Sequence, residues 1–384
     1  MTMNETLLRT SADFFAGIGL VRCALERQGW SDIYSLDYSE MKSAIHLHHF
    51  GPSNYNVQDI NSIKADDVPF VTLAHASFPC TDTSVAGGRK GLLGLESRAF
   101  WEFERLLSQM KDRRPPIILL ENVEGFLTSN GGQDIHNALT ALSDLGYGLD
   151  IFLIDASHFV PQSRVRTFIV GSLHTPPQSI LEQTFILSSP TRARPAKITR
   201  LIQQLKNVRW ALLEVPDLPE RNIQLVDIID TAESWWPPNR TDYMLGQMHE
   251  THKTRIDKLM AQDAWSYGTV FRRMRIRDGI SQSTAEIRTD GIAGCLRTPK
   301  GGSARQIVFR AGFEKFDARL LNARECARLM GADDYKLKES LPLNDALFGF
   351  GDAVCVPAVE WVLENAINPR YLQLTEAVQP LTIS

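Results

Sequence analysis

The sequence predicts a doubly wound α/β domain, with helices on both faces of a mostly parallel sheet, joined to a second, smaller and less regular region. Two observations carry this prediction. Over about the first 175 residues, short apolar runs alternate with longer mixed segments, a pattern typical of strands that alternate with helices. From about residue 184 the alternation stops and proline-containing stretches replace it.

The predicted elements follow one another in strand-then-helix order. The expected pairs are 11–19 with 20–29, 32–39 with 40–51, 68–79 with 100–114, 115–123 with 134–146, and 147–157 with a further strand at 165–172. Helical patterning returns at 322–331 and 356–367. Ligands of such sheets bind beyond the carboxyl ends of the strands, so residues at those ends are the first candidates for a site.

Composition excludes several classes of protein. The chain has 384 residues, 43% hydrophobic and 22% charged, which is ordinary for a soluble globular protein. No apolar run approaches the length of a membrane span, and the N-terminus lacks the pattern of a secretory signal. The five cysteines are scattered and never spaced C-x-x-C, which argues against a disulfide framework or a zinc site and fits a reducing cytoplasm.

The net charge of −4 conceals a segregation of basic residues. Residues 183–213 carry six basic side chains and no acid, and residues 267–310 carry nine basic side chains against three acids. These stretches could meet a polyanion. Charge alone favours the alternative, two solvated basic faces.

Residues at the ends of the first strands suggest a nucleoside-containing cofactor. Gly17 and Gly19 permit a tight turn before a helix, although the G-x-G-x-x-G pattern is incomplete. Asp37 ends the second predicted strand, where it could accept hydrogen bonds from ribose hydroxyls, and Asp59 ends a possible third. An ordinary strand-to-helix turn remains an equal alternative.

Three later stretches place reactive groups at strand ends. Cys80 follows the strand 68–79 and precedes a glycine-rich basic loop, and a buried structural thiol is the competing interpretation. Glu121 ends the strand 115–123 and could act as an acid or cap a helix. Arg164 and Arg166 could bind a phosphate, a carboxylate or a base carbonyl, or lie on the surface.

Together these stretches resemble the DNA cytosine-5 methyltransferase family. The motifs occur in the family's order and approximate spacing: "DFFAGIG", "PCTDTS", "ENV", "QSRVR", "RECARLMG" and "GDAVCVPAVEWV". The resemblance covers nearly the whole chain except about residues 185–290, where the family has its variable region. It implies a Rossmann-like sheet of the S-adenosylmethionine-dependent methyltransferases and a smaller, mostly irregular or β target-recognition domain.

The resemblance also implies a mechanism. Cys80 would attack C6 of a cytosine flipped out of duplex DNA, Glu121 would hydrogen-bond the ring, Arg166 would hold O2, and Arg164 would help to position the loop or the backbone. The methyl group would come from S-adenosylmethionine. The implied cofactor-binding residues are Phe15, Gly17, Gly19, Asp37, Tyr38, Asp59, Ile60, Pro79, Asp352 and Val354.

The implied partner is double-stranded DNA, and the implied setting is a bacterial or phage restriction–modification system, with any endonuclease acting separately. We expect a cytoplasmic, nucleoid-associated monomer without metal or membrane. The expected domains are 1–184 for catalysis and cofactor, 185–312 for target recognition, and 313–384 to complete the catalytic domain. Candidate DNA contacts are Ser84, Arg89 and Lys90 in the loop, and Arg297, Lys300, Arg305 and Gln306 in the recognition region.

Two features depart from the common family pattern: Thr81-Asp82-Thr83 after the cysteine, and Asp352 in place of the usual asparagine. Neither removes a catalytic group. An RNA cytosine-5 methyltransferase and a noncatalytic DNA-binding regulator on the same fold remain alternatives. The target sequence is not predictable, because recognition domains have no simple residue-to-base code.

Overall fold

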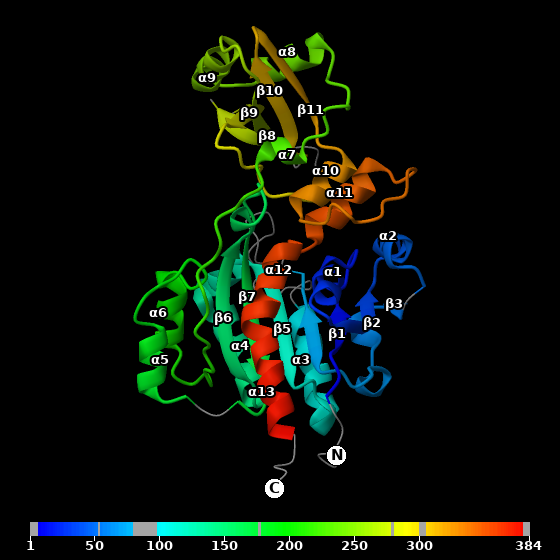
Figure 1. Cartoon of the computed structure of the whole chain (residues 1–384), viewed down its shortest axis with the longest axis vertical. Coiled ribbons are helices and arrows are strands. Elements are labelled where there is room, and N and C mark those ends of the chain that lie inside the picture. The colour runs from blue at the N-terminus through cyan, green and yellow to red at the C-terminus, as the bar shows by residue number, and fades with distance from the viewer. Residues whose placement is uncertain are drawn as a thin grey trace. The chain divides into compact units, whose positions relative to one another are not determined.

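The computed structural model describes residues 7–52, 54–79, 98–175, 178–277, 280–298 and 305–378. The chain forms two compact units (Figure 1). Unit 1 consists of Met1–Asp155, Val165–Leu218 and Ala358–Ser384, and unit 2 of Ala156–Arg164 and Pro219–Pro357.

Unit 1 is built on a seven-stranded sheet in the order β3-β2-β1-β4-β5-β7-β6. The strands are β1 (Thr10–Phe14), β2 (Ser31–Asp37), β3 (Tyr55–Val57), β4 (Leu73–Ala76), β5 (Ile117–Val123), β6 (Gly148–Asp155) and β7 (Val165–Ser172). The first five pair in parallel, and β7 is antiparallel to both β5 and β6. The carboxyl ends of β1, β2, β4 and β5 therefore meet at one edge.

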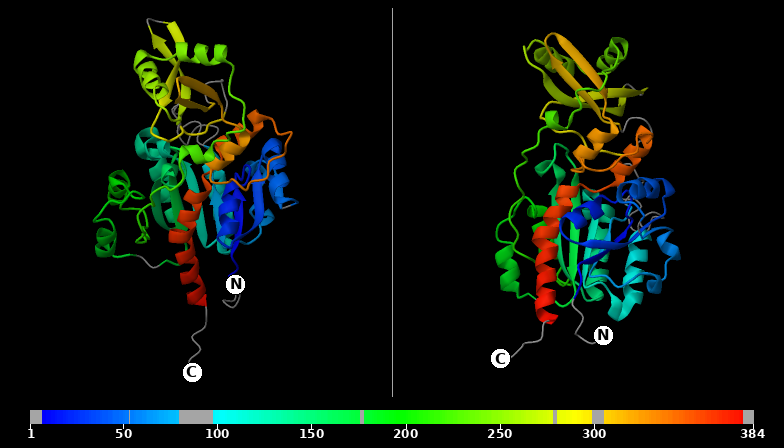
Figure 2. Two further views of the ribbon diagram at one scale, coloured as in Figure 1. Left: turned by 45° about the horizontal axis from the view of Figure 1, so that its top comes forward. Right: turned by 45° about the vertical axis from the view of Figure 1, so that its right-hand side comes forward.

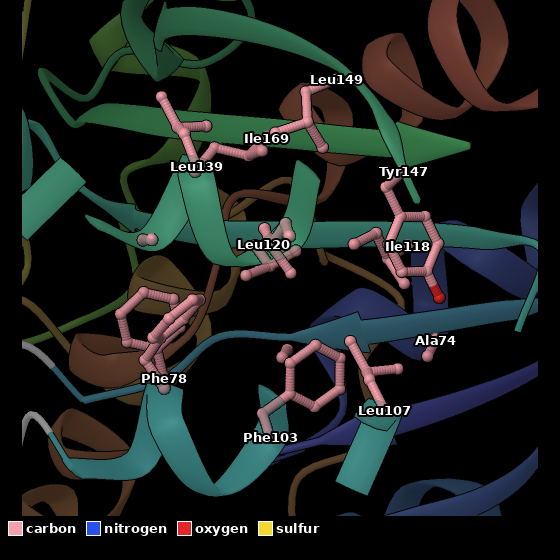
Figure 3. Packing of buried hydrophobic residues seen from close by; sticks show 14 of the residues in the cluster. Ala74, Phe78, Phe103, Leu107, Ile118, Leu120, Leu139, Tyr147, Leu149 and Ile169 are labelled. Carbon is pink, nitrogen blue, oxygen red and sulfur yellow. The ribbon is translucent and has the colours of Figure 1, made fainter. Parts of the chain in front are cut away.

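Helices cover both faces of this sheet. They are α1 (Leu20–Arg27), α2 (Glu40–Phe50), α3 (Arg98–Met110), α4 (Gln133–Asp144), α5 (Ile180–Ile186), α6 (Ala196–Gln204), most of α12 (Val356–Val362) and α13 (Asn368–Val378). On one face, α3 and α4 bury an apolar layer against β5 (Figure 3). The labelled residues of that layer include Phe103, Leu107, Ile118, Leu120 and Leu139.

The opposite face is closed by the C-terminal helices (Figure 2). Side chains alternate along a strand, so Phe152 and Asp150 of β6 point away from the layer that holds Leu149 and Ile151. On that side the Phe152 ring lies 5.8 Å from the ring of Trp361, and Asp150 binds Arg370 of α13. The chain's last helices thus complete the domain that its first strands begin.

A helical run at Leu343–Glu376 is apolar and long enough to cross a membrane by length and composition alone. In the protein, 72% of its most apolar window is buried. This burial fits helices that form part of a protein core.

Unit 2 holds a four-stranded antiparallel sheet in the order β11-β10-β8-β9. Its strands are β8 (Ser266–Arg277), β9 (Ile280–Arg288), β10 (Ile307–Gly312) and β11 (Lys315–Leu320). Its helices are α7 (Leu225–Ile228), α8 (Pro238–Gly246), α9 (Glu250–Met260), α10 (Ala323–Leu329) and α11 (Leu343–Asp352). A small core of apolar side chains, including Met244, Ile256, Val270 and Phe309, lies between this sheet and α8 and α9.

The predicted fold class is confirmed: a mixed α/β sheet with helices on both faces and a smaller β region. The compact units are divided differently from the expected functional domains. Residues 185–218 belong to unit 1, and residues 313–357 belong to unit 2. The boundaries of the recognition domain stay a prediction, because compactness does not define which segment contacts DNA.

Candidate active site and cofactor site

The turn after β1 has an unusual backbone. Phe15, Gly17 and Gly19 have φ values of 62°, 56° and 83°, in the left-handed region that favours glycine. A Cβ on Gly19 would lie 2.6 Å from Nδ1 of His46, so α1 can start this close to α2 only with glycine there. A Cβ on Gly17 would lie 3.9 Å from the Phe15 carbonyl oxygen, an ordinary contact distance, so the positive φ and not crowding favours glycine there.

Asp37, at the end of β2, holds this turn in place. One of its carboxylate oxygens accepts the Gly17 amide and the other accepts the Ser39 amide, both at 2.9 Å. Asp37 is buried, and burial raises its pKa, although Lys42 and the two amides favour the charged form. Each oxygen keeps a second lone pair, so the carboxylate can brace the turn and also accept a ligand hydroxyl.

The other predicted cofactor residues of unit 1 differ in exposure. Tyr38 is 70% exposed, which is unusual for an aromatic side chain at a strand end. Ile60 is buried, and Pro79 is half-buried. Asp59 is exposed, and its Oδ1 accepts the Asn61 amide at 2.9 Å, which caps the short turn that follows.

Glu121 lies between two donors. Its Oε1 is 2.8 Å from Nε of Arg166, and its Oε2 accepts the Ser77 hydroxyl. Strand register produces both contacts: Ala76 pairs with Leu120, so Ser77 and Glu121 come next on neighbouring strands, and Arg166 pairs with Val123, two residues beyond Glu121. The carboxylate is almost completely buried and its orientation is fixed from both sides.

A buried polar layer underlies these strand ends. His75 Nδ1 is 2.7 Å from Asp13 Oδ1, and both side chains are 1% exposed. Asp32 accepts the hydroxyls of Ser11 and Ser35. Burial, and then the Asp13 carboxylate, raise the pKa of Asp32 to about 7. The pair of Asp13 and His75 depends on the register of β1 with β4, so no motif indicated it.

Arg164 belongs to unit 2 and is buried. Its guanidinium donates to the carbonyls of Leu296 at 3.0 Å and Gly351 at 3.1 Å, and also to that of Ala353. These contacts use the guanidinium within unit 2, and the predicted catalytic role of Arg164 stays a prediction. Asp352, exposed at the end of α11, and the buried Val354 lie beside these carbonyls in sequence.

The candidate DNA contacts of unit 2 are not alike. Arg297 is exposed. Arg305 donates to the Asn344 side chain, and Gln306 is buried, with its amide 3.4 Å from the Cys295 carbonyl. Gln306 therefore does not present its amide on the protein surface. The remaining predicted residues lie outside the described part of the chain: Cys80, Ser84, Arg89, Lys90 and Lys300.

An antiparallel strand inserted between β5 and β6 places this sheet in the methyltransferase class of doubly wound folds, as the sequence predicted. The family model of the C-5 cytosine-specific DNA methylases matches residues 9–368. The chain belongs to that family, so the predicted family is confirmed.

Among similar proteins, the Type II methyltransferase M.DsaV of Dactylococcopsis salina is 33% identical over 95% of this chain and 87% of its own length. The match to M.NgoBI of Neisseria gonorrhoeae is 32% identical over 41% of this chain, and that to M.BanI of Aneurinibacillus aneurinilyticus is 35% identical over 53%. These two matches span about half of those proteins, 49% and 48%.

Solved structures share the fold. The Dnmt2 methyltransferase of S. pombe superposes with a TM-score of 0.58 at 16% identity, covering 94% of this chain and 98% of its own. The Entamoeba histolytica methyltransferase EhMeth gives 0.61 at 14% identity, covering 98% of this chain and 100% of its own.

Proposed function

We propose that this protein transfers a methyl group from S-adenosylmethionine to C5 of a cytosine within a short, specific sequence of duplex DNA. The observation that carries the proposal is the buried carboxylate of Glu121, held between Arg166 and Ser77 at a strand end in a chain of the DNA methylase family. A carboxyl group of fixed orientation at this strand end can accept a hydrogen bond from the exocyclic amine of cytosine, and in its protonated form it can donate one to N3, which carries no hydrogen of its own.

Cys80 is the proposed nucleophile. It comes directly after Pro79, and the preceding carbonyl of Phe78 accepts the Asn122 side chain at 3.3 Å, which ties the end of β4 to the end of β5. The chain that leads to Pro79 therefore lies beside the end of β5 that carries Glu121. The thiolate adds to C6 of the cytosine and forms an S–C6 bond, and the electrons of the C5=C6 bond make C5 nucleophilic.

Glu121 and Arg166 stabilise that addition. Glu121 hydrogen-bonds N3 and the exocyclic amine, where charge develops when the thiolate attacks, and Arg166 binds O2. After C5 has gained the methyl group, a solvent base removes the C5 proton; the electrons of that C–H bond re-form the C5=C6 bond and expel the thiolate from C6, which restores the aromatic ring. A cytosine must leave the base stack to meet these groups, so the reaction requires base flipping.

The glycine-containing turn after β1 and the exposed ring of Tyr38 fit a nucleoside cofactor at the ends of β1 and β2. Asp37 would bind its ribose, Tyr38 and Ile60 would pack against its adenine, and Asp59 would accept the adenine amine. When bound there, S-adenosylmethionine supplies an electrophilic methyl group. The left-handed turn at Phe15–Gly19 lets the backbone approach the cofactor closely.

Transfer of tritium from labelled S-adenosylmethionine to mixed-sequence DNA tests the proposal. We expect Cys80→Ala to abolish transfer while cofactor binding persists. Cys326→Ala, a buried thiol in α10, is the control and should retain transfer. Full activity of Cys80→Ala would contradict the mechanism.

The choice of substrate separates this function from its alternatives. Label that enters tRNA and not DNA would indicate an RNA methyltransferase, and DNA binding without turnover would indicate a regulator. Bisulfite sequencing of DNA from a host that expresses the protein would report the methylated site. A host nuclease blocked by that methylation would support a role in restriction–modification.

A further inference from the structure

The outer part of β8 and β9 forms a two-stranded ribbon. Strand β10 pairs with β8 only along residues 266–270, whereas β9 pairs with β8 from Thr269 to Arg277. Within the four-stranded sheet, residues 271–276 of β8 and 281–286 of β9 thus pair with each other, and Ala285 also bridges to Met248, which lies outside the strands. Figure 2 shows this ribbon, in yellow, running beyond the other strands of its unit.

The two faces of the ribbon differ in chemistry. Residues opposite each other in an antiparallel pair share a face, and successive residues alternate. One face presents Phe271, Arg273 and Arg275 opposite Glu286, Thr284 and Gln282. The other face presents Arg272, Met274 and Ile276 opposite Ala285, Ser283 and Ser281.

The two arginines of the first face are held in place but remain accessible. Arg275 Nη2 is 3.0 Å from Glu286 Oε1, and Arg273 Nε is 3.9 Å from Glu286 Oε2. The Arg273 guanidinium also lies 4.6 Å from the centre of the Phe271 ring. Their side chains are 49% and 53% exposed. A single acid thus faces two arginines, and this face keeps a net positive charge.

We propose that this face of the ribbon enters the major groove of the target DNA, and that Arg273 and Arg275 read base edges there. The inference rests on the proposed function and identifies its specificity-determining element. The major groove is wide enough for a two-stranded ribbon, and arginine binds guanine through two parallel hydrogen bonds. Gln282, exposed on the same face, has the chemistry to pair with adenine.

The opposite face is a poor reader of base edges. Met274 is 59% exposed and Ile276 is 79% exposed, and apolar side chains can recognise only the thymine methyl group. Arg272 is the charged side chain on that side, suited to the phosphate backbone. Under this proposal the bases are read by the ribbon and not by Gln306, which is buried.

Matched lysine substitutions on the two faces provide the test. Arg272 and Arg275 both lie on β8, and substitution of either by lysine keeps the positive charge. Lysine, however, cannot make the two parallel hydrogen bonds that arginine makes to guanine. Each variant methylates a library of duplexes randomised around the wild-type target, and bisulfite sequencing reports the preference at every position. We expect Arg275→Lys to lose discrimination at one base pair by about tenfold or more, and Arg272→Lys to keep the wild-type preference.

Binding to duplex DNA is measured in parallel, so that the inference does not depend on turnover. The double variant Arg273→Gln/Arg275→Gln should weaken binding and flatten its salt dependence, whereas Arg255→Gln, an exposed arginine on α9, should not. If wild-type protein binds duplex DNA through the ribbon but methylates no cytosine, the proposed function fails and the inference stands. An unchanged base preference in Arg275→Lys, or equal binding by the double and the α9 variants, would overturn the inference.

Discussion

Within the described residues, two clusters that each join one acid to two arginines differ in burial. In unit 1, Asp150 accepts Arg194 at 2.8 Å and Arg370 at 3.3 Å, and all three side chains are at most 6% exposed. In unit 2, Glu286 faces Arg273 and Arg275, which are about half exposed.

The composition of a charged cluster therefore does not define its role. Asp150 also accepts the backbone amides of Leu213 and Ile151, so its oxygens are fully used within the core, and Arg194 stacks 4.6 Å from the Phe152 ring. Buried charges need such complete pairing, whereas half-exposed arginines keep donors available for a ligand.

The largest expected effect comes from breaking the buried cluster. Asp150→Ala leaves two buried guanidinium groups without their acid, which should lower the free energy of unfolding by about 3–5 kcal/mol. Urea denaturation of purified protein measures this. A loss under 1 kcal/mol would mean that the core tolerates unpaired charge and that the contrast between the clusters is wrong.

A second prediction concerns His46, a buried imidazole next to Arg22. Burial, and then Arg22 and His49, lower the pKa of His46 from 6.5 to about 3. The folded state therefore binds fewer protons than the unfolded state between these values, and stability falls as the pH drops below 6.5. Relative to its value at pH 8, stability should fall by about 2 kcal/mol at pH 5 through this group.

His46→Gln isolates that contribution, because glutamine does not titrate. The unfolding free energy of wild type minus that of the variant should be larger at pH 8 than at pH 5. A difference independent of pH would show that His46 is not kept neutral. The comparison between variants cancels Asp32, whose raised pKa acts in the opposite direction.

A third prediction concerns the carboxylate held by one arginine and one hydroxyl. Ser77→Ala removes the second donor to Glu121. The rate constant of methyl transfer should fall about tenfold, because a hydrogen bond to a charged group is lost, while KM for DNA and for the cofactor stays near wild type. Ser77→Thr retains the hydroxyl and should restore most of the rate. Equal losses in the two variants would indicate a packing role.

The smallest expected effect lies in the exposed cluster. Glu286→Gln should change the free energy of unfolding by less than about 1 kcal/mol, because partly exposed ion pairs contribute little. The same urea titration that detects Asp150→Ala measures it. A loss comparable to that of Asp150→Ala would show that the ribbon is held together by its charges.

The sequence was sufficient for features that depend on order along the chain. Strand-then-helix alternation predicted the fold class, and six motifs in order predicted the family. Contacts that depend on strand register are not predictable from the sequence. An example is the hydrogen bond that the Ser77 hydroxyl donates to Glu121. The sequence predicts that Gln306 reads a base, because it does not show that packing turns this side chain inward. In the structure Gln306 is buried. The ribbon has a signal in the sequence, the alternation of Arg273 and Arg275 with Met274 and Ile276, but the charge count of residues 267–310 does not separate the two faces.

Arg164 lies in a nine-residue excursion, Ala156–Arg164, from the β6–β7 connection of unit 1 into unit 2. In the same excursion, Gln162 Oε1 accepts the Leu296 amide at 2.9 Å and its Nε2 donates to the Leu329 carbonyl at 2.7 Å. Anyone who grafts unit 2 onto a related enzyme to change its target must transplant this short segment as well. A chimera joined only at residues 219 and 357 would leave buried backbone groups of the graft dependent on a host loop that evolved for another partner.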